Sequence, residues 1–280
     1  MNDSRLEAAM SILLDDNSNY SSVGVPLLFG FGDPTDCVDR FPVFRFSRIQ
    51  DRSRCNTSWT FPEYNMINDI ESKSKTDEKS WDETFSLWRE HYPWNSKIQK
   101  AVWRGSDTGF VKQFPIYKNI TNWRQLPRAQ LSFLSKERPD IIDAGIYHLG
   151  MQGGYGVANF TDYGLMKPRI ESEDFMKYRA IIDVDGNSWS SRLSSILAMN
   201  SVVIKVEPIW SQYFFDELQP WVHYVPANFS NLIETVEYVV SDDNMKQMQE
   251  IVNNAQSWAR SKITRFQVVL DMMWILVAYV

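Results

Sequence analysis

The chain has 280 residues, 44% of them apolar and 23% charged, so it is not a disordered protein. Because a single hydrophobic core rarely grows beyond about 250–300 residues, this length fits one large domain or two medium ones. The net charge of −6 argues against the basic surface of a nucleic-acid-binding protein, so we expect no nucleic-acid partner.

The cysteine content and the chain ends bear on the compartment. Cys37 and Cys55 are too few for a disulfide framework and fit a reducing environment. Residues 1–20 lack the basic and apolar succession of a signal peptide. The apolar segment 268–280 contains Asp271 and is shorter than the about 20 residues that a membrane span needs. We expect a cytoplasmic protein without a membrane span, ending in a buried helix.

The first part of the chain predicts two helices and two strands. Residues 5–14 have the spacing of an amphipathic helix, and the apolar run at 23–31 is typical of a buried strand. A second short strand is expected at 41–46. Residues 81–91 are expected to form a helix that ends before Pro93, since proline cannot continue a helix.

From residue 97 onwards, apolar strands alternate with helical segments. Strands are expected at 100–104, 140–146, 178–184, 201–206 and 222–225, and helices at 125–137, 190–199, 210–218, 231–240 and 244–261. This alternation predicts an α/β protein with parallel sheets. Ligands of such sheets bind beyond the carboxyl ends of the strands, so the loops there are the places to search for a site.

The common catalytic motifs are missing from the sequence. It contains no Walker A phosphate loop, no G-x-S-x-G elbow and no H-E-x-x-H zinc motif. His91, His148 and His223 are scattered, and the two cysteines do not make a zinc-binding set. The glycine-rich segment 150–156 would let its backbone approach a ligand closely, but its irregular spacing favours an ordinary loop.

Two loops carry residues suited to binding an anion. Residues 104–109, RGSDTG, follow a strand with an arginine, small residues and hydroxyl groups, which suits either a phosphate site or an ordinary turn. Residues 185–192, DGNSWSSR, combine a glycine turn, serines and an arginine before a helix, which favours an anion held without a metal. The alternative is that Asp183 and Asp185 form a D-x-D pair for a divalent cation.

Asp33 lies in a Gly-Asp-Pro turn directly after the first predicted strand. Aspartate before proline commonly forms turns. The functional alternative is a general base at the mouth of a cleft, where partial burial would tune the pKa of its carboxyl group.

Together these segments resemble glycosyltransferase family ninety, which contains the Rumi-type protein O-glucosyl/O-xylosyltransferases and the fungal capsule-associated xylosyltransferases. The resemblance covers about residues 23–279 and is tightest at 177–226, which includes KYRAIIDVDGNSWSSR, SVVIKV and FFDELQPWVHYVP. WRGSDTG, LSFLSKERPDIIDA, LLFGFGDP, PVFRFS and SWTFPE are similar to further family segments. A short member of this kind looks like those encoded by large algal viruses, which would place it in the host cytoplasm.

The resemblance implies a GT-B fold, in which two Rossmann-like domains face a cleft. Residues 1–96 would form the acceptor-side domain and residues 97–262 the UDP-sugar-binding domain. Residues 263–280 would form a helix that packs back on the N-terminal domain.

The resemblance also implies a reaction: inverting transfer of a sugar from a UDP-sugar to a hydroxyl of a glycan or glycoprotein, such as a viral capsid or surface glycan. Xylose is the first choice of sugar and glucose the second, with no cofactor and no essential metal. Asp33 would be the catalytic base, and Arg128 and Arg192 would hold the diphosphate. The implied donor-binding residues are Arg104, Gly105, Ser106, Thr108, Arg128, Asp185, Gly186, Ser190, Ser191 and Arg192, and the implied acceptor-binding residues are Trp59, Thr60 and Phe61.

Two alternatives stay open at this stage. One is a metal-dependent GT-A transferase that uses Asp183 and Asp185. The other is a carbohydrate-binding protein that keeps the fold without catalysis, and the joint presence of Asp33, Arg128 and Arg192 favours an enzyme over it.

Overall fold

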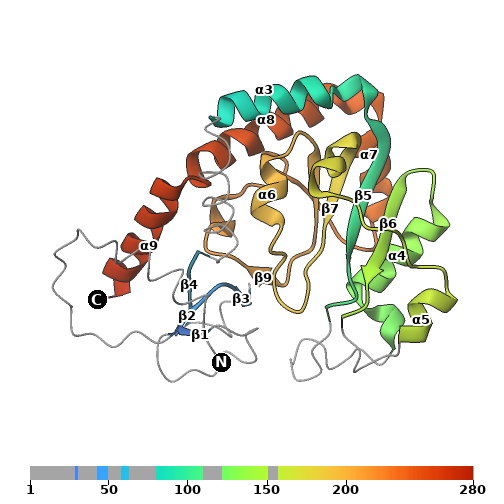
Figure 1. Cartoon of the computed structure of the whole chain (residues 1–280), viewed down its shortest axis with the longest axis horizontal. Helices are drawn as coiled ribbons and strands as arrows, with labels where there is room; N and C mark the ends of the chain where they lie inside the picture. The colour runs from blue at the N-terminus through green and yellow to red at the C-terminus, as the bar shows by residue number, and fades with distance from the viewer. Residues whose placement is uncertain are drawn as a thin grey trace.

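The computed structural model describes residues 29–30, 43–49, 58–62, 80–109, 122–150 and 157–279. These residues form two parallel sheets, a two-stranded antiparallel sheet and the helices that cover them (Figure 1). The predicted α/β class is confirmed, and two separate parallel sheets are what the GT-B arrangement requires. The predicted helix at 5–14, Asp33 and most of the glycine-rich segment lie outside the described residues.

The larger sheet has five parallel strands in the order β10-β8-β7-β5-β6. These are β5 (Ile98–Ser106), β6 (Ile142–His148), β7 (Tyr178–Asp183), β8 (Val202–Val206) and β10 (Val225–Ala227). The chain passes from β5 to β6 on one side and then returns to β7 on the other. The carboxyl ends of β5 and β7 therefore form a topological switch point, where open α/β sheets bind their ligands.

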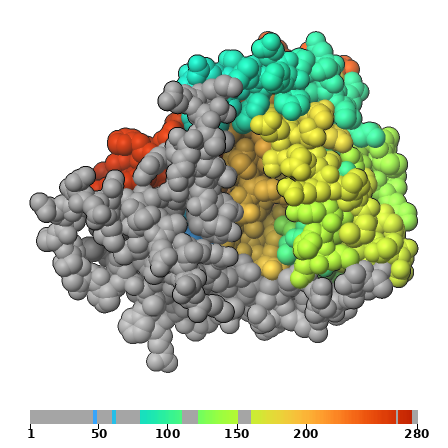
Figure 2. All heavy atoms as spheres, in the orientation of Figure 1, coloured from blue at the N-terminus to red at the C-terminus, as the bar shows by residue number. Residues whose placement is uncertain are grey.

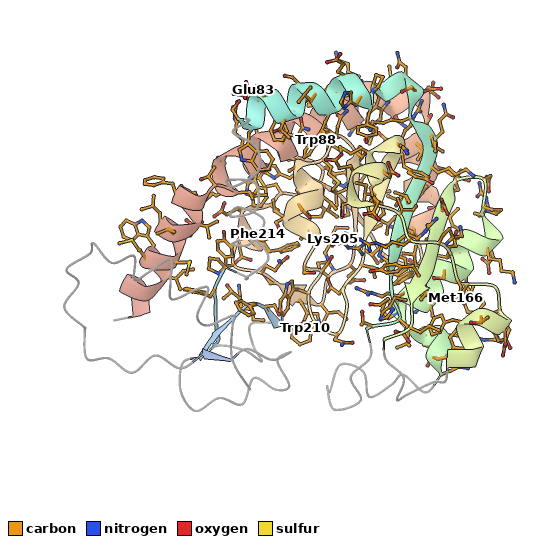
Figure 3. The ribbon with its side chains drawn as sticks, viewed as in Figure 1. Glu83, Trp88, Met166, Lys205, Trp210 and Phe214 are labelled. Carbon is orange, nitrogen blue, oxygen red and sulfur yellow. The ribbon has the colours of Figure 1, made fainter. Side chains whose placement is uncertain are left out.

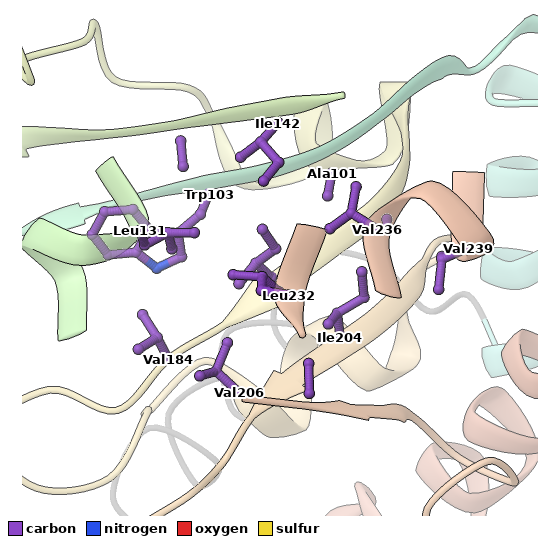
Figure 4. Close-up of a cluster of buried hydrophobic side chains, with 14 of the residues drawn as sticks. Ala101, Trp103, Leu131, Ile142, Val184, Ile204, Val206, Leu232, Val236 and Val239 are labelled. Carbon is purple, nitrogen blue, oxygen red and sulfur yellow. The ribbon is translucent and has the colours of Figure 1, made fainter. Parts of the chain in front are cut away.

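Alternating side chains along the strands build one core on each face of this sheet. Ala101 and Trp103 belong to the first core, and Val102 between them belongs to the second. The first core (Figure 4) is closed by Leu131 of α4 (Pro127–Glu137) and by Leu232, Val236 and Val239 of α7 (Leu232–Val240). The second core is closed by α6 (Leu193–Ala198) and by the later turns of α8 (Met245–Lys262).

The N-terminal strands form the smaller parallel sheet, in the order β1-β2-β4. They are β1 (Phe29–Gly30), β2 (Val43–Arg45) and β4 (Ser58–Thr60). The next strand after β2, β3 (Arg48–Ile49), instead pairs antiparallel with β9 (Trp210–Ser211), which follows β8. The β3–β9 pair therefore joins the N-terminal segment to the chain between β8 and β10 of the larger sheet.

The strand β9 corrects the predicted helix at 210–218, which is wrong. Within 210–218 only the turn η5 (Phe215–Glu217) is helical. Trp210 and Ser211 pair with β3 instead, and the backbone N–H groups of Ile209 and Trp210 donate to the carboxylate of Asp185. The strand predicted at 222–225 begins only at its last residue, and the helix predicted at 190–199 begins at Leu193. The remaining predicted strands and helices of this half are present, with ends shifted by a few residues.

Two long helices lie side by side along one edge of the molecule (Figure 1). Helix α3 (Trp81–His91) contacts α8 through Arg89 and Gln256, whose Nη2 and Oε1 atoms are 2.7 Å apart. The side chains of α3 form a ridge along this edge in the space-filling view (Figure 2). The shorter elements are η1 (Trp94–Ser96), η3 (Trp123–Gln125), α5 (Val157–Asp162), η4 (Ser172–Lys177) and η6 (Asp242–Asn244).

The C-terminal helix α9 (Arg265–Tyr279) is buried on one face only. Val268 and Met272 share a core cluster with Phe61, which follows β4, whereas 74% of Phe266 and 69% of Trp274 are exposed. No helix among the described residues is long and apolar enough to cross a membrane. The division into domains at residues 96 and 262 stays a prediction.

Candidate functional site

Arg128 reaches the switch point from the first turn of α4. Pro127 is pre-organised for the first position of this helix, and the side chain that follows it points back towards the end of β5. The Arg128 Nη1 atom lies 3.0 Å from the carbonyl oxygen of Ser106, and its Nε atom lies 3.1 Å from that of Asp185. Its Nη1 also donates to the hydroxyl of Thr108. One buried guanidinium therefore ties the loop after β5 to the loop after β7.

Arg192 approaches the same strand end from the opposite face of the sheet. It is the N-cap residue of α6, and its Nη1 donates to the carbonyl oxygen of Arg104. Its guanidinium lies 6.0 Å from the ring of Phe175 in the second core, whereas that of Arg128 lies 5.5 Å from Trp103 in the first. Burial lowers the pKa of the half-buried Arg192 from its ordinary value. The two arginines thus bracket the end of β5.

Nearby side chains explain a glycine at the end of β5 and one in the loop after β7. A Cβ on Gly186 would lie 3.0 Å from Nη2 of Arg128, so the absence of a side chain makes room for the guanidinium. A Cβ on Gly105 would lie 2.4 Å from the fully buried ring of Trp103. The backbone N of Gly109 donates to Oδ1 of Asn187 over 3.0 Å, a second bond between the loops.

We use the word crevice for the region beyond the carboxyl ends of β5 and β7, between Arg128 and Arg192. The side chain of Arg104 is turned away from this crevice and forms a network of its own. Its donors go to the carbonyl oxygens of Trp103, Asp143 and Pro168 and, at 3.0 Å, to the Asp143 carboxylate. Burial raises the pKa of the Asp143 carboxyl, but bonds from Lys167 and Tyr178 and the charge of Arg104 outweigh it and bring the pKa to about 2. Burial and Asp143 raise the pKa of Tyr178 to about 12. Arg104 therefore meets the crevice through its backbone carbonyl.

Asp183 and Asp185 share one lysine. Lys205 Nζ lies 2.7 Å from an oxygen of each carboxylate, and all three side chains are buried. Burial disfavours the ammonium, but the two carboxylates outweigh this and raise the pKa of Lys205 above its ordinary value. No group of three or more possible metal ligands lies among the described residues. Each carboxylate of the D-x-D pair instead bonds to Lys205, and the choice between binding with and without a metal stays a prediction.

The other residues predicted to bind the donor differ in how deeply they are buried. The hydroxyl of the buried Ser190 donates to Asp183, and Ser191 is exposed. Ser106 and Thr108 are half-buried at the end of β5. None of these positions is tested as a ligand contact, and they stay predictions.

The predicted acceptor residues lie at the end of β4. Thr60 is half-buried, and Phe61 is 2% exposed and packs in the second core. The strand that carries Trp59 pairs with β2, so the three residues sit at the edge of the small sheet. Asp33 lies outside the described residues, and its role as the base stays a prediction.

Sequence reasoning missed the two residues that hold the loops in place. Lys205 appears in the sequence as a single charge inside the apolar strand SVVIKV, and a charge in a buried strand needs a partner. In the sequence Asn187 looks like an ordinary turn residue, and its bond to Gly109 is seen in the structure. The parallel register places Lys205 opposite Asp183, which the strand order alone would not have predicted.

The fold and the site define a class of protein, and the comparisons define the family. A parallel α/β sheet with two arginines at its switch point is typical of proteins that hold an anionic group there. The model of the family described as "Glycosyl transferase family 90" matches residues 33–280. The chain therefore belongs to this glycosyltransferase family, as the resemblance of its motifs implied.

The individual relatives match over part of their length. The chain is 29% identical to Protein O-glucosyltransferase 2 of Danio rerio, over 61% of this chain and 30% of that protein. It is 28% identical to the uncharacterized protein 035R of Invertebrate iridescent virus 3, over 62% of this chain and 16% of that protein. It is 25% identical to O-glucosyltransferase rumi of Drosophila melanogaster, over 71% of this chain and 44% of that protein. The chain spans less than half the length of each.

A solved structure gives a weaker match. Anabaena HepE in complex with UDP and glucose is 10% identical, with a TM-score of 0.47 over 85% of this chain and 62% of that chain.

Proposed function

We propose that the chain transfers a sugar from a UDP-sugar to a hydroxyl of a glycan or glycoprotein, with inversion and without an essential metal. The observation that carries this proposal is the pair of guanidinium groups, Arg128 and Arg192, fixed on both sides of the end of β5. Two cations at a switch point suit a diphosphate, and family membership supplies the sugar nucleotide.

The proposed reaction uses one base and two cations. The acceptor hydroxyl oxygen attacks the anomeric carbon, the bond from that carbon to the UDP oxygen breaks, and the hydroxyl proton passes to the carboxylate of Asp33. UDP leaves with an added negative charge, which Arg128 and Arg192 stabilise. Lys205 already neutralises the D-x-D carboxylates, which supports a reaction without a metal at that position.

The donor sugar is glucose or xylose. The resemblance puts xylose first, because the fungal branch of the family uses it, whereas two of the three relatives described above are named as O-glucosyltransferases. The two donors differ by one hydroxymethyl group, a difference that a pocket distinguishes by about 1–3 kcal/mol.

A donor panel tests the proposal. We expect calorimetry to show binding of UDP, and UDP release to be fastest with UDP-glucose or UDP-xylose and to persist in EDTA. Asp33→Asn should bind UDP normally and lose transfer. Loss of turnover in EDTA with recovery in Mn²⁺ would revive the metal-dependent alternative. Absence of any UDP binding in calorimetry would contradict the proposal, because it is the result expected for a carbohydrate-binding protein without catalysis.

A further inference from the structure

A buried lysine lies between two carboxylates beside the donor crevice. Lys205 on β8 is directly opposite Asp183 on β7, and its Nζ is 2.7 Å from both Asp183 and Asp185. The exposed fractions of the three side chains are 2%, 1% and 8%. Figure 3 labels Lys205 and, on the β9 strand that follows, Trp210. Each of these three buried charges needs a partner of opposite charge, since burying an unpaired charge is unfavourable.

Asp185 extends this cluster in three directions. One carboxylate oxygen accepts from Lys205, and the other accepts from the backbone N of Ile209 at 2.8 Å and of Trp210 at 3.2 Å. Its backbone carbonyl accepts from Nε of Arg128 at 3.1 Å. Asp185 therefore fixes one of the acceptors that orient Arg128, and Lys205 helps to fix Asp185.

The charges around the crevice give Lys205 a second effect. Among Lys205, the two aspartates and the two arginines, loss of the lysine would leave Asp183 and Asp185 to offset the positive charges of Arg128 and Arg192. With the lysine, the five groups carry one net positive charge. The carboxylate oxygens are also occupied by Lys205 and by N–H and hydroxyl donors, rather than by the two arginines. In a site of low dielectric constant this balance has a large effect on anion binding.

We propose that Lys205 is a positioning residue for the donor. Its ammonium neutralises Asp183 and Asp185 and fixes the segment that orients Arg128, and it occupies the place that a divalent cation takes in a metal-dependent D-x-D site. The inference rests on the proposed function, because it concerns binding of the UDP portion of the donor.

The first test compares two buried lysines. Lys97 is 5% exposed and lies at the opposite end of the sheet, where it donates to the carbonyl oxygen of Met176 and the hydroxyl of Ser201. Lys205→Ala and Lys97→Ala should both lower the melting temperature. Calorimetry well below both melting temperatures should show UDP affinity reduced at least tenfold in Lys205→Ala and within twofold of the native value in Lys97→Ala. Equal affinity losses in the two variants, or none in Lys205→Ala, would overturn the proposal.

A rescue experiment separates positioning by charge from general structural support. Removing the lysine side chain leaves two carboxylates facing a space suited to a hard cation. Mn²⁺ should therefore restore much of the UDP affinity of Lys205→Ala while leaving Lys97→Ala and the native chain unchanged. Absence of any Mn²⁺ effect in Lys205→Ala would show that the ammonium does not act as a substitute for a cation.

A second pair of variants decides the case if Lys205→Ala does not fold. Asp185→Asn and Asp183→Asn each remove one carboxylate from Lys205, but only the carboxylate of Asp185 also accepts from the backbone N–H groups of Ile209 and Trp210. Both variants gain the same net positive charge, so the difference between them reports positioning. Asp185→Asn should bind UDP less tightly than Asp183→Asn and should show faster amide hydrogen exchange at Ile209 and Trp210. Equal effects of the two variants on both measurements would contradict the proposal. If the native chain itself does not bind UDP, the proposed function fails, and the exchange comparison still decides whether the cluster fixes this segment.

Discussion

Arg192 is the residue whose surroundings point most directly to a ligand. It is half-buried, it donates to the carbonyl of Arg104, and it forms no ion pair within the part of the chain that the structure describes. Because a hydrogen bond to a charged group contributes about 1.5–3 kcal/mol, Arg192→Met should weaken UDP binding by about tenfold to a hundredfold. Calorimetry with UDP measures this directly.

Arg179 provides the matched control for that variant. It is a buried arginine at the amino end of β7, and its donors go to the carbonyl of Val240 and, at 2.6 Å, to the carboxylate of Asp242. Arg179→Met should lower stability and leave UDP affinity within twofold of the native value. A comparable affinity loss in both variants would mean that Arg192 has no specific part in donor binding.

Lys97 predicts a pH dependence of stability. Burial lowers its pKa from 10.5 to about 7. Between these two values the unfolded chain binds the proton that the folded chain has released, so stability rises with pH there, by up to about 1.4 kcal/mol per unit. Below pH 7 the cost of burying the ammonium is present in full. Urea unfolding at pH 7, 8 and 9 should show this rise, and Lys97→Met should remove it; equal slopes in both proteins would refute this origin.

The elements differ in how well the sequence predicts them. The strands of the larger sheet follow from apolar runs such as IIDV and VVIKV, because both faces of these strands are buried. The strand β9 does not follow, because it is two residues long and depends on pairing with β3, far away in the sequence. Within the site, the arginines and the glycine turns can be recognised in the sequence as the patterns RGSDTG and DGNSWSSR. The role of Lys205 cannot, since it depends on strand register.

The N-terminus of α3 carries a prediction at the scale of the element. Ser80 and Glu83 form a capping box, in which each side chain accepts from the other's backbone N–H. Ser80→Ala should therefore cost about 1 kcal/mol in the free energy of unfolding. Ser86→Ala, an exposed serine in the interior of the same helix, is the control and should stay within about 0.5 kcal/mol of the native chain. Urea denaturation of both variants distinguishes a cap effect from a general effect of losing a hydroxyl.

At the scale of the whole molecule, the donor loops are connected to the N-terminal segment as well as to the larger sheet. The loop after β7 contacts the N-terminal segment through Trp189, whose ring centroid lies 6.0 Å from that of Phe46. The carboxylate of Asp185 holds the start of β9, which pairs with β3. A ligand in the crevice should therefore stabilise the N-terminal strands as well as the larger sheet.

This connection predicts one cooperative response to UDP. A ligand present at 100 times its dissociation constant stabilises the folded state by about 2.7 kcal/mol. Saturating UDP should raise the melting temperature of the whole chain in a single transition, whereas UMP, with one phosphate for the two arginines, should raise it less. Two separate transitions, only one of them shifted by UDP, would show that the sheets unfold independently.

Main-chain anchoring of the arginines has a consequence for how this site evolves. The guanidinium groups of Arg128 and Arg192 rest on the carbonyl oxygens of Arg104, Ser106 and Asp185. Any amino acid supplies a carbonyl oxygen, so a mutation of Ser106 can be accepted without moving either cation, provided the strand keeps its path. The crevice can thus retain its anion-binding geometry while its side chains drift towards new donor sugars.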